Sequence, residues 1–256
     1  MSATLRLVPA LAAATKIHAE DPSKPLWQPG WKLRVNGEEM PAETDWEVTS
    51  RFGAVRPAVV PHADGTPNFD RPLYSEAPNV NIVAYGVEDD GTVRIAIIRQ
   101  PRPHANDPLQ PGVDGHAPVV FGQIAMGFLE KIIGETAEEA AQRETDEETG
   151  GCHVLSMFQP AYPYHNPNPT FVDTWSDLWF VQVNLKRINE LKFDRNEPIF
   201  SAEYVTVEEL FSRIKSGVDA DGAVYRMCTA NSILMIFFAT FPQYLAGVVG
   251  KELAAV

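Results

Sequence analysis

The chain has 256 residues, of which 45% are apolar and 21% are charged, a composition typical of globular proteins. Its formal net charge of −13 argues against binding to duplex nucleic acid, because neutralising phosphates requires a concentrated face of lysine and arginine. The two cysteines, Cys152 and Cys228, cannot form a disulfide framework, so we expect a protein of the reducing cytoplasm. The apolar stretch 233–249 is interrupted by Pro242 and Gln243, which predicts a buried helix followed by a turn and no membrane span.

The first 78 residues differ in texture from the rest of the chain. They are rich in proline and glycine, and the segments 31–35 and 47–52 are short β-type runs. This pattern predicts a small β-rich N-terminal unit over residues 1–78, and the main domain then covers residues 79–256.

The main domain begins with a predicted hairpin. The β-rich runs 80–85 and 93–98 are separated by the turn signal Asp89-Asp90-Gly91. Residues 101–118 and 162–170 are read as loops rich in proline and polar residues. Further strands are expected at 119–124, 153–158, 178–185 and 204–205, and helices at 136–149, 207–216 and 224–241. Strands that alternate with helices in this way predict an α/β core.

The helix over 136–149 carries the strongest chemical signal. Thr136 and Glu139 form a capping-box pattern at its start, and Gly150 is placed to end it. Between them, offsets of three and four residues put three carboxylates on one helical face: Glu144, Glu147 and Glu148. Each such pair of like charges destabilises a helix by roughly 0.2–0.5 kcal/mol. The face is therefore either a solvated acidic surface or a site for a divalent cation with oxygen ligands.

The same segment resembles the Nudix box: Gly, five residues, Glu, seven residues, Arg-Glu, a hydrophobic residue, one residue, Glu-Glu, one residue, Gly and a hydrophobic residue. Six positions match, namely Glu135, Arg143, Glu144, Glu147, Glu148 and Gly150. The first glycine of the pattern is displaced, because Gly127 stands two residues before the expected position at Leu129. Thr145 and Gly151 replace the two hydrophobic residues. The resemblance implies a Nudix-type α/β/α sandwich with a mixed β-sheet.

The resemblance also implies roles for the residues of the box. Glu144 and Glu148 would be the principal ligands of Mg²⁺, with Mn²⁺ as a possible substitute, and Glu147 would assist. Arg143 would orient the carboxylates by ion pairing. The backbone carbonyl of Met126 would join the metal shell.

Beyond the box, the chain resembles the ADP-ribose pyrophosphatase branch of the family. Arg99-Gln100-Pro101-Arg102-Pro103 is similar to that branch's Gln-aromatic-Arg segment, and Pro167 lies near the position of its Pro-Gly turn. Arg102 would then contact a substrate phosphate, unless it forms a structural ion pair. Trp46 would stack on adenine, unless it packs in a core or an interface.

The expected activity is the magnesium-dependent hydrolysis of ADP-ribose or an ADP-sugar to AMP and a sugar phosphate. Glu197, in a downstream loop, is the expected general base or an additional metal ligand, unless it is an ordinary charged loop residue. Glu203 is the second candidate. The alternatives are a UDP-sugar or dinucleotide pyrophosphatase, or a catalytically silent Nudix fold that senses a nucleotide. The resemblance further implies a homodimer.

Overall fold

The computed structural model describes residues 67–102, 119–130, 134–150, 153–166, 175–188, 199–225 and 228–245. Before residue 74, and at Ser75 and Arg102, it describes the backbone of the strands alone. The chain divides into two compact units, one made of Met1–Ala77 with Asn166–Trp175 and the other of Pro78–His165 with Ser176–Val256. Each unit is taken by itself below.

The strands described in the first unit all pair antiparallel. Its larger sheet has the order β1-β4-β5-β6, with bounds β1 Thr4–Leu5, β4 Val48–Ser50, β5 Gly53–Pro61 and β6 Pro67–Glu76. A second pair joins β2 Arg34–Val35 to β3 Glu38–Glu39. The expected β-rich character is present, but the longest strands are β5 and β6, which the sequence reading did not predict.

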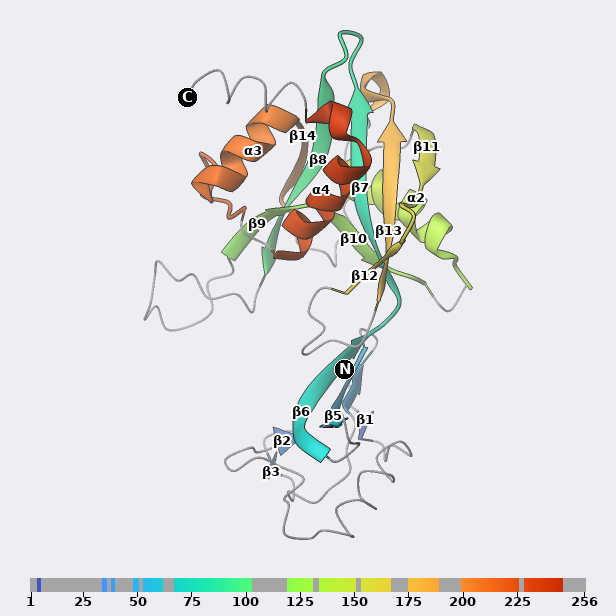
Figure 1. The fold of residues 1–256 in the computed structure, drawn as a ribbon, viewed down its shortest axis with the longest axis vertical. Coiled ribbons are helices and arrows are strands. Elements are labelled where there is room, and N and C mark those ends of the chain that lie inside the picture. The colour runs from blue at the N-terminus through green and yellow to red at the C-terminus, as the bar shows by residue number, and fades with distance from the viewer. Residues whose placement is uncertain are drawn as a thin grey trace. The chain divides into compact units, whose positions relative to one another are not determined.

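The second unit holds an eight-stranded mixed sheet (Figure 1). Its central order is β11-β13-β7-β8-β14, and β12, β10 and β9 pair with β13, β7 and β8, respectively. The bounds are β7 Asn79–Val87, β8 Val93–Arg102, β9 Val119–Gln123, β10 Ala125–Phe128, β11 Val154–Phe158, β12 Tyr164–His165, β13 Ser176–Val183 and β14 Ser201–Thr206. Only the pairing of β13 with β7 is parallel among these described strands.

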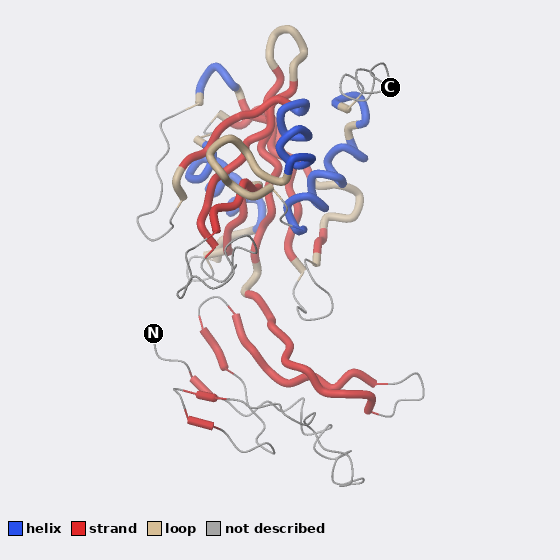
Figure 2. The backbone as a smooth tube through the Cα atoms, turned by 90° about the vertical axis from the view of Figure 1, so that its left-hand side faces the viewer, coloured by secondary structure: helices blue, strands red, loops and turns tan. Residues whose placement is uncertain are grey.

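Among the described residues, three α-helices cover the two faces of this sheet. They are α2 Ala137–Thr149, α3 Val207–Ser216 and α4 Cys228–Thr240, and short 3₁₀ turns follow β13 at Leu185–Arg187 and α4 at Pro242–Tyr244. Ala140 and Ala141 of α2 pack on one face with Ile82, Ala96 and Val181. On the other face, α3 and α4 pack against the alternate residues, including Val83, Ile97 and Phe180. Figures 1 and 2 show strands between helices, so the predicted α/β/α sandwich is confirmed.

The sheet contains a fork that positions the site. Strands β7 and β8 pair directly only at Tyr85–Val87 and Val93–Ile95, next to their turn. Farther from the turn, β10 pairs with Asn79–Ile82 of β7 and β9 pairs with Ile98–Arg102 of β8. Strands β9 and β10, joined through Ile124, therefore fill the space between the two arms. The sequence predicted one strand over 119–124 and did not predict β10.

Local chemistry explains the ends of the elements around the fork. In the β7–β8 turn, Asp90 Oδ1 accepts a hydrogen bond from the Thr92 amide, and Gly91 adopts a φ of 86° that favours glycine. Helix α2 starts with the predicted capping box at Thr136 and ends at Gly150 with a φ of 69°. The α3 prediction matches its observed bounds, whereas α4 begins four residues later than expected.

Candidate functional site

Two carboxylates of α2 are buried against β10. Glu144 and Glu148 lie one helical turn apart and are 4% and 2% exposed, whereas the side chain of Glu147 is 44% exposed. Glu148 Oε2 accepts a hydrogen bond of 2.9 Å from the Met126 amide. The three carboxylates of the predicted acidic face thus differ in burial: two are turned toward the sheet and one toward solvent.

The Glu144 carboxylate packs on the backbone of Gly127. A Cβ atom at Gly127 would lie 1.8 Å from Glu144 Oε1 and 1.9 Å from its Cδ, so any side chain there would displace the carboxylate. The glycine that stood out of place in the box pattern therefore makes room for an acidic side chain. Sequence reasoning missed this role, although a glycine inside a strand often marks a close approach of another group.

Arg143 connects the helix to the loop before it. Its guanidinium donates to both carboxylate oxygens of Glu135, at 2.8 and 3.1 Å, and to the Phe128 carbonyl oxygen at 3.0 Å. Its Nη1 donates to Glu144 Oε1 at 2.7 Å and to Glu147 Oε2 at 3.1 Å. These hydrogen bonds raise the pKa of Arg143, with Glu135 as the largest cause, and they lower the pKa of Glu135.

Thr145 occupies a position that is hydrophobic in the pattern, and it is fully buried. Its hydroxyl donates to the Ala141 carbonyl oxygen at 2.6 Å, and Thr149 donates in the same way to Thr145. A buried hydroxyl costs little when it is bonded to the carbonyl four residues earlier. This departure from the pattern leaves the packing of α2 intact.

The donor chemistry of the site suits a hard divalent cation. Glu135, Glu144 and Glu147 share the single guanidinium of Arg143, so negative charge is in excess before Glu148 is counted. Carboxylate oxygens are the ligands that Mg²⁺ takes in proteins. Within the described residues, however, no three acidic, histidine or cysteine side chains are arranged to hold a metal ion. The residues thus fit a divalent cation by the chemistry of their oxygen donors, whereas their arrangement in the described structure does not form a metal-binding group.

Comparison with known proteins decides the family. The NUDIX domain model matches residues 76–228. The chain belongs to the Nudix domain family. An uncharacterized Nudix hydrolase of Listeria monocytogenes is 33% identical over 86 residues, which are 34% of this chain and 47% of the relative. The match thus spans about half the length of that relative. The Nudix domain of NrtR from Shewanella oneidensis, solved with ADP-ribose, aligns with 64% of this chain and 88% of its own at 10% identity and a TM-score of 0.41.

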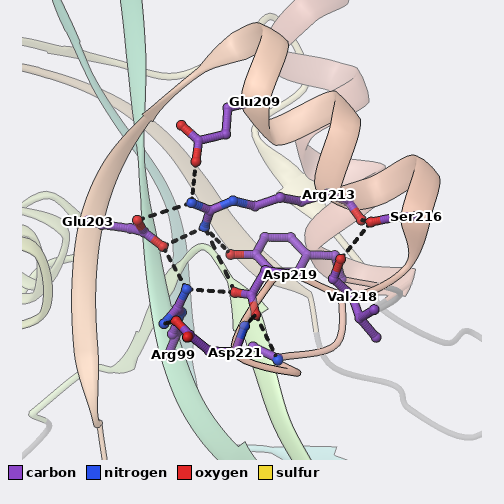
Figure 3. Close-up of polar contacts among 10 residues, drawn as sticks. Arg99, Glu203, Glu209, Arg213, Ser216, Val218, Asp219 and Asp221 are labelled. Atoms are coloured by element: carbon purple, nitrogen blue, oxygen red, sulfur yellow. Dashed lines mark hydrogen bonds and ion pairs between the residues drawn. The ribbon is translucent and has the colours of Figure 1, made fainter.

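A second charged cluster lies on the opposite face of the Nudix domain sheet (Figure 3). Glu203 of β14 forms ion pairs with Arg99 of β8 and Arg213 of α3, and Arg99 also pairs with Asp219 at 2.7 Å. The next residue, Tyr204, donates its hydroxyl hydrogen to Thr149 of α2. Because neighbours along a strand face opposite ways, Glu203 faces away from the carboxylates of α2. Glu203 therefore acts as a structural anion, which leaves Glu197 as our candidate base.

The remaining predicted residues are placed in part or not at all. Arg102 is the last residue of β8, where its backbone pairs with Val119. Met126 lies on β10 and contacts Glu148 through its amide. Trp46, Pro167 and Glu197 lie outside the described residues. None of the helices in the described part of the chain combines the length and apolarity needed to cross a bilayer.

Proposed function

We propose that this Nudix protein hydrolyses, with Mg²⁺, the pyrophosphate bond of a nucleoside diphosphate linked to another group. The preferred substrate is ADP-ribose or an ADP-sugar, and the products are AMP and a sugar phosphate. The observation that carries the proposal is the pair of buried carboxylates, Glu144 and Glu148, held between α2 and β10. Each of the two has a donor, Arg143 for Glu144 and the Met126 amide for Glu148, but one guanidinium does not neutralise all the acids grouped around it. This excess of buried negative charge supports a site for a cation.

The residues of the chain divide the chemistry among them. Glu144 and Glu148, helped by Glu147, would hold the cation, which when bound neutralises phosphate charge and makes water a better nucleophile. Arg143 keeps the carboxylates oriented through its planar fork. Glu197 is proposed to accept the proton of the water that attacks phosphorus, as the bridging oxygen leaves with the other phosphate. The backbone of Met126 is proposed to complete the cation site.

The substrate class rests on the resemblance to the ADP-ribose pyrophosphatase branch. Arg102, at the end of β8, is proposed to contact a phosphate. Trp46 is proposed to stack on adenine, and Pro167 to shape the loop near the substrate. A homodimer is proposed on the same grounds, and a monomeric mass by sedimentation equilibrium would contradict it. A cytoplasmic location is proposed because the two cysteines cannot form a disulfide framework.

A substrate panel tests the activity. The protein is incubated with Mg²⁺ and ADP-ribose, UDP-glucose or a dinucleotide, and the released phosphomonoesters are identified. We expect AMP and ribose 5-phosphate from ADP-ribose at the highest kcat/KM. Faster turnover of UDP-glucose or the dinucleotide would move the specificity to that class. Tight nucleotide binding without turnover would identify a sensor, the candidate from another functional class.

A variant of the carboxylate pair tests the site. Glu148→Gln should lower kcat by at least about 100-fold, the scale for losing one charge-stabilising group. Folding should be preserved, because the amide oxygen can still accept from the Met126 amide and one like-charge repulsion disappears. Glu138→Gln is the matched control, since Glu138 is an exposed residue of the same helix. Equal activity of the two variants would contradict the assignment.

A further inference from the structure

A pair of carboxamides joins the two strands of the β8 arm of the fork. Gln123 of β9 is 1% exposed, and its Nε2 donates a hydrogen bond of 2.7 Å to Gln100 Oε1 of β8. Phe121 stands directly opposite Gln100 in the register of the two strands. Gln100 and Phe121 are both partly exposed. A partly exposed glutamine therefore stands opposite a partly exposed phenylalanine, and a buried carboxamide is hydrogen-bonded to the glutamine.

These three residues share the face of the sheet on which α2 packs. Gln123 is opposite Ile98, which lies two residues beyond Ala96, and Ala96 packs with α2. The intervening Gly122 faces the other way, because a Cβ atom there would meet the ring of Tyr225. Side chains alternate along strands, so Phe121 and Gln123 point to the face opposite Tyr225.

The carboxamide pair and the carboxylate site are connected by a short segment of the chain. Gln123 precedes Met126, whose amide binds Glu148, by three residues. At the rise of a β-strand this is about 10 Å. A group attached to a diphosphate at Glu144 and Glu148 can reach that far, which brings it to the Gln100 carboxamide bonded to Gln123. Phe121, opposite Gln100 and about 17 Å from Met126 along the strand, would border the outer end of that group.

The chemistry of the patch selects the kind of group. A carboxamide offers two donor hydrogens and one acceptor oxygen, which suits the hydroxyl groups of a sugar. A partly exposed ring gives the apolar surface that ligand sites combine with a few fixed polar groups. Gln123 limits the rotation of Gln100, because its donated bond fixes which end of the Gln100 amide faces outward.

We propose that Gln100 and Phe121 form the subsite for the sugar attached to the diphosphate, and that Gln123 is its positioning residue. The substrate in this inference comes from the proposed function. The inference adds the residues that set the preference for the sugar attached to the diphosphate. Because sites that hydrogen-bond a substrate hydroxyl discriminate strongly against analogues lacking it, the sugar hydroxyls should govern kcat/KM.

The test pairs a protein change with a substrate change. ADP-ribose is compared with the analogue that lacks the 2-hydroxyl and the analogue that lacks the 3-hydroxyl of the terminal ribose. In the wild-type protein at least one analogue should be poorer by about tenfold or more. Gln100→Ala should lower kcat/KM for ADP-ribose about five- to tenfold and reduce this discrimination to near unity. Gln182→Ala is the control, because Gln182 lies on β13 and accepts from Ser156 instead. Unchanged discrimination in Gln100→Ala would overturn the proposal.

Gln123→Met tests positioning separately from folding. Methionine is similar in size to glutamine but lacks the amide that donates to Gln100. Discrimination between ADP-ribose and its deoxy analogues should therefore fall, and an unchanged melting temperature would show that the fold is retained. A variant that melts like wild type and discriminates like wild type would remove Gln123 from the proposal.

A binding measurement separates this inference from the proposed activity. Ribose 5-phosphate is titrated into wild type and Gln100→Ala and observed by ligand NMR. If wild type does not hydrolyse ADP-ribose but binds ribose 5-phosphate and the variant does not, the subsite stands and the proposed hydrolysis fails. If wild type does not bind ribose 5-phosphate and hydrolyses no substrate, the subsite and the proposed hydrolysis are both overturned.

Discussion

Glu144 owes its position to a neighbour that has no side chain. The Gly127→Ala substitution places a Cβ atom 1.8 Å from Glu144 Oε1, and backbone and carboxylate must separate to relieve the overlap. We expect the free energy of unfolding to fall by about 1–3 kcal/mol, as in other overpacked cores, and turnover to fall with it. Urea denaturation measures the first effect and initial rates the second.

A double variant identifies the cause. If the overlap with Glu144 destabilises Gly127→Ala, then shortening the acid in Gly127→Ala/Glu144→Ala should recover much of the lost stability, although not activity. Purely additive losses in stability would show that the glycine is needed for another reason.

Residue spacing alone predicted part of the site. Offsets of three and four along a helix are local, so Glu144, Glu147 and Glu148 could be grouped from the sequence. Arg143 was assigned to them by the resemblance to the Nudix box. The partners on β10 could not be predicted, because the contacts of Gly127 and the Met126 amide arise from packing between a helix and a strand. The opposite orientation of Glu203 likewise depends on the register of β14.

At the scale of elements, α2 depends on its first turn. The Thr136 hydroxyl accepts from the Glu139 amide, and the Glu139 carboxylate accepts from the Thr136 amide. Thr136→Ala should lower the free energy of unfolding by about 1 kcal/mol, because one amide of the first turn loses its acceptor. Thr136→Ser keeps the oxygen and should stay close to wild type in the same urea titration. If both variants lost the same free energy of unfolding, the missing cap would not explain the destabilisation of Thr136→Ala.

Elements with a strong local pattern were predicted well, and elements made by distant pairing were not. The hairpin of β7 and β8, helix α2 and helix α3 follow from turn residues, caps and periodicity. Strands β5 and β6 contain prolines, which lack a backbone N–H and argue against strands. In the register of the two strands, however, Pro57 is opposite Pro72 and Pro61 is opposite Pro67, so each residue without an N–H pairs with another. The start of α4 was predicted too early because Val224 bonds to Val120 and Gly122 of β9.

At the scale of the whole molecule, the acidic charge gives a test of pH dependence. Arg143 holds the pKa of Glu135 below its usual value of 4.5, so the ionised form is favoured in the folded state. The stabilisation is present above pH 4.5 and is lost as the pH falls through the lowered pKa. Glu135→Gln should therefore be less stable than wild type at pH 7.

The difference between wild type and Glu135→Gln is the quantity to follow. It should shrink as the pH falls below 4.5, because wild type then loses the same ion pair that the variant lacks. Using a difference removes the general effect of the net charge of −13, whose self-repulsion weakens in acid for both proteins. If the difference in unfolding free energy stayed constant from pH 7 to pH 3.5 in urea titrations, the ion pair between Glu135 and Arg143 would not be its source.

The fork between β7 and β8 separates two tasks along one continuous peptide. Beyond Ile124, the residues of β10 support the acids of α2, and before it the residues of β9 face the arm of β8. Because the two segments pair with different strands, we expect substitutions in β9 to leave the contacts between β10 and α2 in place. Under the proposed function, a lineage of such proteins would exchange one sugar preference for another through β9 while the proposed cation site on β10 and α2 stayed unaltered.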